Sequence, residues 1–144
     1  MYPSALRQMH QWGSDVLPKS RDLVPRLIKR GLDIKQTDWL GATFLHSAAR
    51  DFDTGIASVL IDHGADIDAV DFSNRETPLT AAIRSEPWCA NDSDRVLAKR
   101  KRVAMVKFLL RRGASRYPGV PTWALPLAVA RNLGRTELEE LLEP

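Results

Sequence analysis

Cysteine is nearly absent from this sequence of 144 residues, which contains Cys89 alone. A single cysteine excludes an intramolecular disulfide and is typical of proteins in a reducing compartment. The chain also lacks an apolar run near the ~18 residues that a membrane-spanning helix needs, and its N-terminus lacks the basic and apolar segments of a secretion signal. We therefore expect a cytoplasmic protein with no membrane partner.

Recognisable catalytic and cofactor motifs are also missing. The sequence contains no G-x-G-x-x-G, P-loop, H-E-x-x-H, C-x-x-C or G-x-S-x-G pattern. Cys89 has no histidine near it in sequence, so we interpret it as an inert thiol. Structural roles account for His10, His46 and His63. We expect no catalytic residues, no cofactor and no enzymatic activity.

A run of aspartates lacks the spacing that calcium ligands need. The EF-hand pattern D-x-[DN]-x-[DN]-G with a distal Glu does not occur. These carboxylates instead occupy positions that are typical of turns, and we expect no bound metal. The run consists of Asp62, Asp66, Asp68 and Asp71.

Acidic residues are absent from one long segment. Residues 95–136 contain 11 Lys or Arg and no Asp or Glu, whereas residues 1–94 and residues 137–144 each carry a net charge of −4. The overall charge of +3 conceals this division. A basic block of this kind produces a strong local field and favours an acidic partner.

What the sequence does contain is a repeated pattern, and its clearest copy begins at Asp38 and runs to Ala69. The copy joins a turn, a T-x-L-H-x-A-A helix start and a closing L-x-x-x-G-A-D, and it resembles an ankyrin repeat. Phe44 replaces the proline of that family's T-P-L-H, and Asp68 replaces its asparagine. The residues that match in one gap-free register are Asp38, Gly41, Thr43, Leu45, His46, Ala48, Ala49, Leu60, Gly64, Ala65, Asp66 and Ala69.

The rest of the chain repeats the same pattern. Gly31 lies 33 residues before Gly64, Thr77 lies 34 residues after Thr43, and a last partial copy starts at Leu125. The resemblance predicts one all-α domain, an ankyrin-repeat solenoid of about four helix-turn-helix units. We place the units at residues 1–37, 38–70, 71–119 and 120–144, with a capping helix over residues 4–12.

The third unit departs from the pattern. Gly64 and Gly113 are 49 residues apart, which leaves one extra residue in the turn and 15 more between the two helices, an insertion at about residues 86–100. We expect Asp92 or Ser93 to cap a second helix of about 20 residues that projects beyond the stack. Asn74 is expected to take the left-handed position of the turn glycine. Trp88 and Trp123 are expected to pack the insertion onto the stack.

The resemblance implies a function. Ankyrin arrays generally bind proteins on a concave side that is lined by the turns and by the first helix of each unit, and His46 is expected to bond the backbone of the next turn. We interpret Trp39 as an interface residue, and leave two roles open for Phe72, interface or cover of a neighbouring turn. The contact positions carried over from the family are Trp39, Leu40, Ala42, Arg50, Asp51, Phe72, Ser73, Arg75, Arg84 and Ser85.

Three hypotheses follow for function. The first is a non-catalytic module, monomeric before binding, that binds and inhibits or neutralises one protein partner, as immunity proteins do. In it, the basic cluster Lys99, Arg100, Lys101 and Arg102 faces an acidic partner. The second is a nucleic-acid-binding protein that uses the basic helix over residues 95–112. The third is an adaptor subunit of a larger complex, which docks through Trp88 and the insertion.

Overall fold

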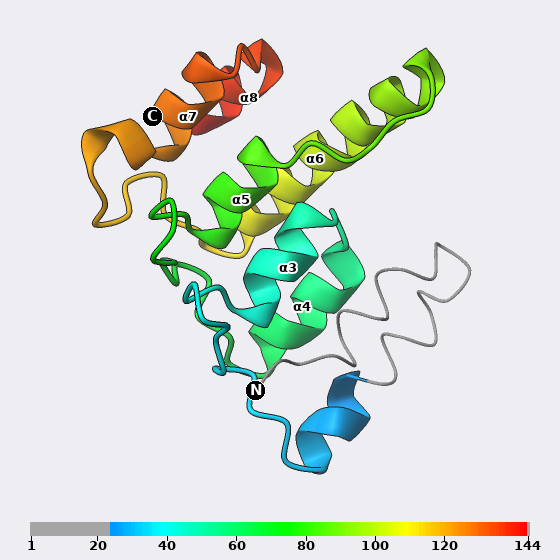
Figure 1. Ribbon diagram of the computed structural model, residues 1–144, viewed down its shortest axis with the longest axis vertical. Coiled ribbons are helices and arrows are strands. Elements are labelled where there is room, and N and C mark those ends of the chain that lie inside the picture. Colours follow the sequence, from blue (N-terminus) through cyan, green and yellow to red (C-terminus); the bar gives the residue numbers. More distant parts are fainter. Residues whose placement is uncertain (1–23, 144) are drawn as a thin grey trace.

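The computed structural model describes residues 24–143, and these form an α-helical stack with no strand among them. The predicted capping helix over residues 4–12, with His10, lies outside the described residues. Residues 24–29 are helical, and an isolated bridge joins Thr37 to Thr43. The remaining elements, in chain order (Figure 1), are α3 (Phe44–Arg50), α4 (Thr54–Asp62), α5 (Pro78–Arg84), α6 (Asp92–Arg111), the 3-10 turn η2 (Thr122–Ala124), α7 (Pro126–Asn132) and α8 (Thr136–Leu142).

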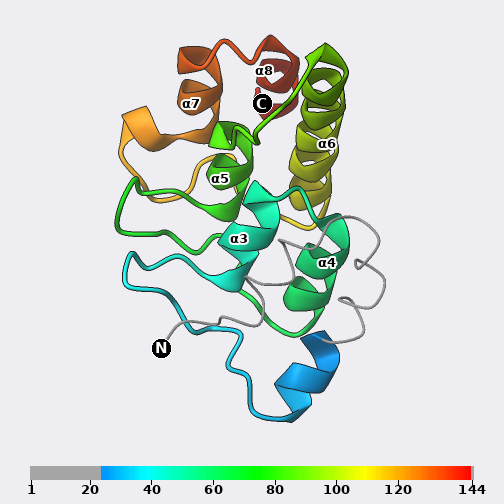
Figure 2. The ribbon, with the colours of Figure 1, turned by 45° about the vertical axis from the view of Figure 1, so that its right-hand side comes forward.

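The helices form two layers (Figure 2). One layer contains the first helices of successive units, α3, α5 and α7, and the other contains the second helices, α4, α6 and α8. The turns that lead into the first helices lie together along one side of the stack (Figure 2). This arrangement confirms the all-α ankyrin-repeat fold.

Helices α3, α4, α5 and α6 each begin at a side chain that accepts from a backbone N–H group of the first turn. The Thr43 hydroxyl accepts from the N–H of His46 at the start of α3, and the Thr77 hydroxyl accepts from the N–H of Thr80 at the start of α5. Pro78 occupies the first turn of α5, where a missing N–H costs nothing. The cap of α6 is Asn91, one residue before the predicted Asp92.

The helices of three units end at a glycine with a positive φ. Gly31, Gly64 and Gly113 have φ angles of 101°, 94° and 99°. This left-handed conformation turns the chain out of the helix, and a Cβ would strain it. The prediction of these helix ends is confirmed.

The prediction for the third turn is wrong. The left-handed residue is Arg75, with a φ of 55°, and not Asn74. Asn74 instead donates its backbone N–H to the carboxylate of Asp71, 3.2 Å away. The turn carries one extra residue, so the glycine position must be counted back from Thr77 and not forward from Asp71. Counted that way, Arg75 is the equivalent of Gly41, whose φ is 81°.

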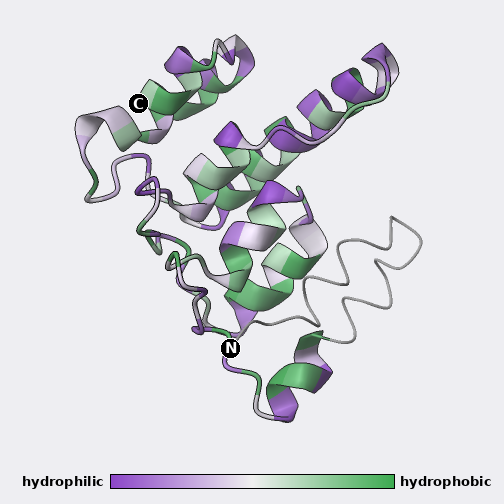
Figure 3. Ribbon diagram, in the orientation of Figure 1, coloured by the Kyte–Doolittle hydropathy of each residue, from purple (hydrophilic) through white to green (hydrophobic). Residues whose placement is uncertain are grey.

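The core lies between the two layers and continues along the stack. Figure 3 shows the apolar sides of the helices turned toward one another. Ala48 and Ala49 are fully buried, and their small side chains let neighbouring helices approach closely. The largest fully buried apolar side chains are Leu45, Ile56, Leu60, Leu79, Ile83, Met105, Leu109, Leu138 and Leu142.

The lengthened helix α6 projects beyond the stack, as predicted (Figure 1). It has 20 residues against nine in α4 and seven in α8. Its buried residues begin at Arg102, while Val96 and Leu97 in the first half are 52% and 50% exposed. Among residues 24–143, no helix has both the length and the apolar character needed to cross a bilayer.

Candidate protein-binding surface

The turn that precedes α3 and the turn that precedes α5 contact each other at their tips. The backbone N–H of Phe72 donates to the carbonyl oxygen of Leu40 at 2.7 Å. The Phe72 ring lies over Gly41, where an added Cβ would come within 2.8 Å of a ring carbon. Gly41 is therefore required both by its positive φ and by this contact.

The same tips expose large aromatic side chains. Trp39 is 77% exposed and Phe72 is 75% exposed. Phe72 therefore covers the neighbouring turn with one part of its ring and leaves most of its surface to solvent, and its interface role stays a prediction. Arg75 is exposed on the same turn as Phe72. We call Trp39, Phe72 and Arg75 the turn-tip surface.

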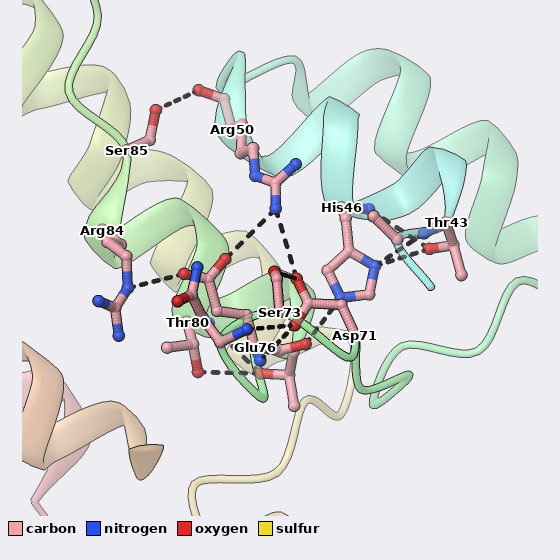
Figure 4. Close-up of polar contacts among 12 residues, drawn as sticks. Thr43, His46, Arg50, Asp71, Ser73, Glu76, Thr80, Arg84 and Ser85 are labelled. Carbon is pink, nitrogen blue, oxygen red and sulfur yellow. Dashed lines mark hydrogen bonds and ion pairs between the residues drawn. The ribbon is translucent and has the colours of Figure 1, made fainter. Parts of the chain in front are cut away.

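A buried polar network holds these turns in place (Figure 4). Asp71 is fully buried, and its Oδ1 accepts from the backbone N–H groups of Asn74 and Glu76. His46 on α3 reaches across to the same turn, with its Nε2 2.8 Å from the carbonyl oxygen of Glu76. The role that the family implies for His46 is therefore present here.

The hydrogen bonds of His46 define its protonation state. The backbone N–H of Thr43 donates to His46 Nδ1 at 3.1 Å, so the ring proton resides on Nε2 and donates to Glu76. Burial lowers the pKa of His46 below its usual value. The histidine is a neutral structural link between two units.

Two arginines from successive first helices share one buried carboxylate. Arg84 Nε lies 2.7 Å from Glu76 Oε1, and Arg50 Nη2 lies 3.4 Å from Glu76 Oε2. Their side chains remain 40% exposed for Arg50 and 39% for Arg84, so each has one side free for a partner. Both line a hollow of about 370 Å³ between α3 and α5, together with Ser85. We call this hollow the inter-helix groove.

The other predicted contact positions divide between exposed and buried. Asp51 and Ser73 are exposed, and Leu40 is half-buried. Ala42 is 6% exposed, so its side chain is not available to a partner, and that prediction is wrong. The cause is the hairpin-like turn, in which the N–H of Asp38 donates to the carbonyl oxygen of Ala42 and draws Ala42 against the helices.

Arg102 is a second correction. It is 6% exposed and belongs to the interior, whereas Lys99, Arg100 and Lys101 are exposed as predicted. Arg102 Nη2 donates to the carbonyl oxygen of Ser85, and the guanidinium lies over the Phe52 ring, 5.5 Å from its centroid. The four consecutive basic residues point to different sides of the helix, and one of them has to face the stack.

Much of the basic block is neutralised by acidic residues from other parts of the chain. Arg112 pairs with Asp62, Arg135 pairs with Glu86, and Arg131 pairs with Glu139 and Glu143. Lys99 lies 3.8 Å from Glu137. Among the described residues of the block, Arg100, Lys101, Lys107, Arg111 and Arg116 are exposed and form no ion pair with a described carboxylate. The field of the block is consequently weaker than its sequence suggests.

The predicted packing role of the two late tryptophans is wrong. Trp88 is 87% exposed and Trp123 is 56% exposed. The polar interactions of Arg102 and Arg135 close the insertion onto the stack in their place. Cys89 is half-buried, and its thiol donates to the carbonyl oxygen of Pro87 at 3.3 Å.

The aspartate run stabilises turns. Asp66 accepts from the N–H of Asp68, and Asp68 accepts from the N–H of Ser115 in the next unit. Asp62 pairs with Arg112. Within residues 24–143, no group of three His, Cys, Asp or Glu side chains is arranged to hold a metal ion.

Reasoning from the sequence missed Asp71 and Glu76 as the centre of the network. The sequence did contain a signal for this network. Glu76 is a charged residue directly before the helix that starts at Thr77, whereas the equivalent residue of the preceding unit is the small Ala42. A carboxylate at that position needs a cation, and Arg50 and Arg84 at the ends of both first helices supply it.

Comparison with known proteins agrees with this geometry. A family description of ankyrin repeats in three copies matches residues 16–116. Protein phosphatase 1 regulatory subunit 27 of Homo sapiens is 42% identical over 69 residues, which cover 48% of this chain and 43% of that protein, and its Mus musculus counterpart gives the same values. The matched segment thus spans less than half the length of either curated relative. The chain belongs to the ankyrin repeat family, whose members are protein–protein interaction modules.

Proposed function

We propose that this protein binds one protein partner through the turn-tip surface and the inter-helix groove, and that binding regulates the partner without catalysis. The observation that carries the proposal is the exposure of Trp39 and Phe72, 77% and 75%, on adjacent turn tips. Aromatic and arginine side chains supply most of the binding energy at protein interfaces. A rigid scaffold that presents them holds them ready at little entropic cost.

The inter-helix groove complements this surface with charge. Arg50 and Arg84 flank the buried carboxylate of Glu76 and keep about two-fifths of their surfaces exposed. Their outward N–H groups are suited to an acidic side chain or a carbonyl oxygen of the partner. Arg75, Arg100 and Lys101 extend the basic character and would steer an acidic protein toward the stack.

A regulatory role is supported by the curated relatives, which are regulatory subunits of a phosphatase. By analogy, the present chain would bind an enzyme and change its activity by covering part of its surface. Inhibition of the partner is the specific expectation. The narrower hypothesis of an immunity protein rests on analogy from family and size alone and stays a prediction.

The adaptor hypothesis has one observation in its favour. Trp88 on the loop before α6 is 87% exposed, and Val96 and Leu97 on the projecting half of the helix are about half exposed. An apolar group of this kind suits a second docking surface in a larger assembly. The nucleic-acid hypothesis is weakened, because Arg102 is buried and Arg112 is paired within the chain.

The proposal is tested by capture from native lysate, followed by identification of the bound proteins. The wild-type chain serves as bait beside Trp39→Ser/Phe72→Ser, which removes both exposed rings of the turn-tip surface. Trp88→Ser is the matched control, because it removes an equally exposed aromatic side chain elsewhere. We expect a protein that the wild type and the Trp88 variant capture and the turn-tip variant loses.

Two further results decide between the functions. An activity assay of the captured partner should show a change upon addition of the purified chain. Capture that depends on Trp88 and not on Trp39 or Phe72 would transfer the role to the insertion and contradict the proposal. Capture that disappears after nuclease treatment would support nucleic acid as the bound species instead.

A further inference from the structure

A cavity of about 470 Å³ lies between the insertion and the last unit, away from the turn-tip surface. The loop before α6, the projecting half of α6 and the turn that joins α7 to α8 form its walls. None of the three segments would enclose it alone. The lengthened helix that distinguishes this chain from a regular array is therefore what creates the cavity.

The charged side chains on the cavity walls are mainly cations. Arg95, Lys99 and Arg102 come from successive turns of α6, and Arg135 comes from the α7–α8 turn. The only acidic side chains among the described lining residues are Glu86 and Glu137. Arg95 Nη1 also lies 3.6 Å from Asp92 Oδ1, outside the lining, so the positive excess of the open cavity centres on Arg102, and it attracts an anion.

The two deepest cations have unused donors. Arg102 is 6% exposed, and the side chain of Arg135 is 12% exposed. The Nε–H of each is buried and has no hydrogen-bond partner among the described residues. Buried guanidinium donors are normally satisfied, so these two lining side chains have hydrogen-bonding capacity that the described residues do not use.

The Arg102 guanidinium is also held in place. Arg102 is fixed by the carbonyl oxygen of Ser85 and by the Phe52 ring. Burial, and after it the nearby charge of Arg135, lower the pKa of Arg102. An anion between them would relieve this repulsion.

The carboxylates that now face these cations are loosely held. Glu86 Oε1 lies 2.9 Å from Arg135 Nη2, but its side chain is 74% exposed on a loop. Glu137 Oε2 lies 3.8 Å from Lys99 Nζ, at the limit of an ion pair. Each pair has one well-exposed partner, Glu86 in the first and Lys99 in the second, so an incoming anion of higher charge can compete for both cations.

We propose that this cavity binds a small molecule that carries a phosphate or diphosphate group. Arginine forks match phosphate oxygens with paired hydrogen bonds, and Lys99 and Arg95 at the rim add charge. The volume lies within the usual range for small-molecule sites and exceeds what one phosphate needs. The anionic group would lie between Arg102 and Arg135, with the rest of the molecule toward α6.

The test is titration of the full chain with inorganic pyrophosphate, followed by calorimetry and by amide chemical shifts. Inorganic phosphate and a nucleoside diphosphate form separate arms, which distinguish a simple anion from a larger phosphate ester. We expect saturable binding with one site and shifts centred on Arg102 and Arg135. Arg95→Gln/Lys99→Gln should weaken pyrophosphate binding about tenfold or more, since two charged donors are removed.

Two matched variants separate a built site from general attraction. Arg100→Gln/Lys107→Gln removes the same charge from exposed positions of α6 outside the cavity, and it should leave affinity within about twofold. Glu86→Gln should tighten binding, because it removes the resident competitor at Arg135, whereas Glu140→Gln on the exposed side of α8 should not.

The proposal is overturned by any of three results. One is the absence of saturable binding by all three probes up to about 10 mM. Another is an equal loss of affinity in the two arginine–lysine double variants, which would indicate unspecific attraction. The third is an equal gain in Glu86→Gln and Glu140→Gln. Each variant is first checked for an unchanged melting temperature, so that loss of folding is not mistaken for loss of the site.

Discussion

Arg102 Nη2 donates to the carbonyl oxygen of Ser85 at 2.7 Å and ties the long helix α6 to the end of α5. Ser85 in turn donates its hydroxyl to the carbonyl oxygen of Arg50 at the end of α3, also at 2.7 Å. Carbonyls at helix C-termini lack partners within the helix, and here the following element supplies each one. The insertion is thereby connected through two hydrogen bonds to the unit before it.

Replacement of Arg102 is therefore expected to destabilise the fold. Arg102→Ala removes a buried donor to Ser85 and the contact with Phe52, and it should lower the free energy of unfolding by about 2–4 kcal/mol. Arg100→Ala is the control, because Arg100 carries the same charge on the same helix but is exposed. It should change the free energy of unfolding by less than about 0.5 kcal/mol. Urea denaturation measures both, and equal effects would show that Arg102 has no structural role.

The buried His46 predicts a dependence of stability on pH. Its pKa is lowered in the folded state, chiefly by burial, whereas in the unfolded chain it stays near ~6.5. Above that pH both states are neutral and stability is complete. As the pH falls below ~6.5, His46 becomes protonated in the unfolded state but stays neutral in the folded state. The free energy of unfolding therefore declines by up to ~1.4 kcal/mol per pH unit.

His46→Gln provides the check on this assignment. Unfolding free energies measured between about pH 5 and pH 7 should lose most of their slope in this variant, although its overall stability is lower. His63→Gln changes an exposed histidine and should keep the slope of the wild type. A slope that survives in His46→Gln and vanishes in His63→Gln would contradict the role of His46.

Arg75 holds a conformation that costs free energy. Its φ of 55° places a residue with a Cβ in the left-handed region, which glycine adopts without steric strain. Arg75→Gly should raise the free energy of unfolding by about 1 kcal/mol and at the same time weaken partner binding, because the arginine belongs to the turn-tip surface. Asn74→Gly, one residue earlier, should not stabilise. A destabilised Arg75→Gly would show that the side chain supports the turn.

Glu76 is expected to stabilise the joint between two units. Glu76→Gln keeps the shape of the side chain but removes the charge that Arg50 and Arg84 share, and it should cost about 1–2 kcal/mol. The effect is limited because both arginines are partly exposed and screened by water. Glu140→Gln removes a carboxylate from an exposed position and is the control. Thermal melting at low and high salt should show the difference shrinking as salt is added.

The fold was predictable because the helices of ankyrin units start and end at residue types that few other positions in a chain require. Thr43 and Thr77 mark helix starts and Gly64 and Gly113 mark helix ends, and each depends on local chemistry alone. The left-handed conformation of Arg75 was not predicted, because the extra turn residue shifts the register. Counting forward from Asp71 gives Asn74, whereas counting back from Thr77 gives Arg75. The local pattern does not show that direction.

The candidate site was predictable only in part. The exposure of Trp39 and Phe72 was predictable because the family's contact positions lie on turn tips. Arg102 was misplaced because a run of basic residues reads as a solvated surface, and only packing decides which side of α6 meets α5. Arg135 and the cavity it lines depend on contacts between residues about 50 positions apart, and no sequence spacing encodes them.

The central claim, that a protein partner docks on the turn tips, is tested most directly by the affinity of the captured partner for three purified chains. Trp39→Ser/Phe72→Ser should bind at least about 100-fold more weakly than the wild type, because two exposed aromatic anchors are lost. Trp88→Ser should stay within about threefold of the wild type, and all three should melt at similar temperatures. Unchanged affinity in the turn-tip variant, with a large loss in Trp88→Ser, would contradict the account.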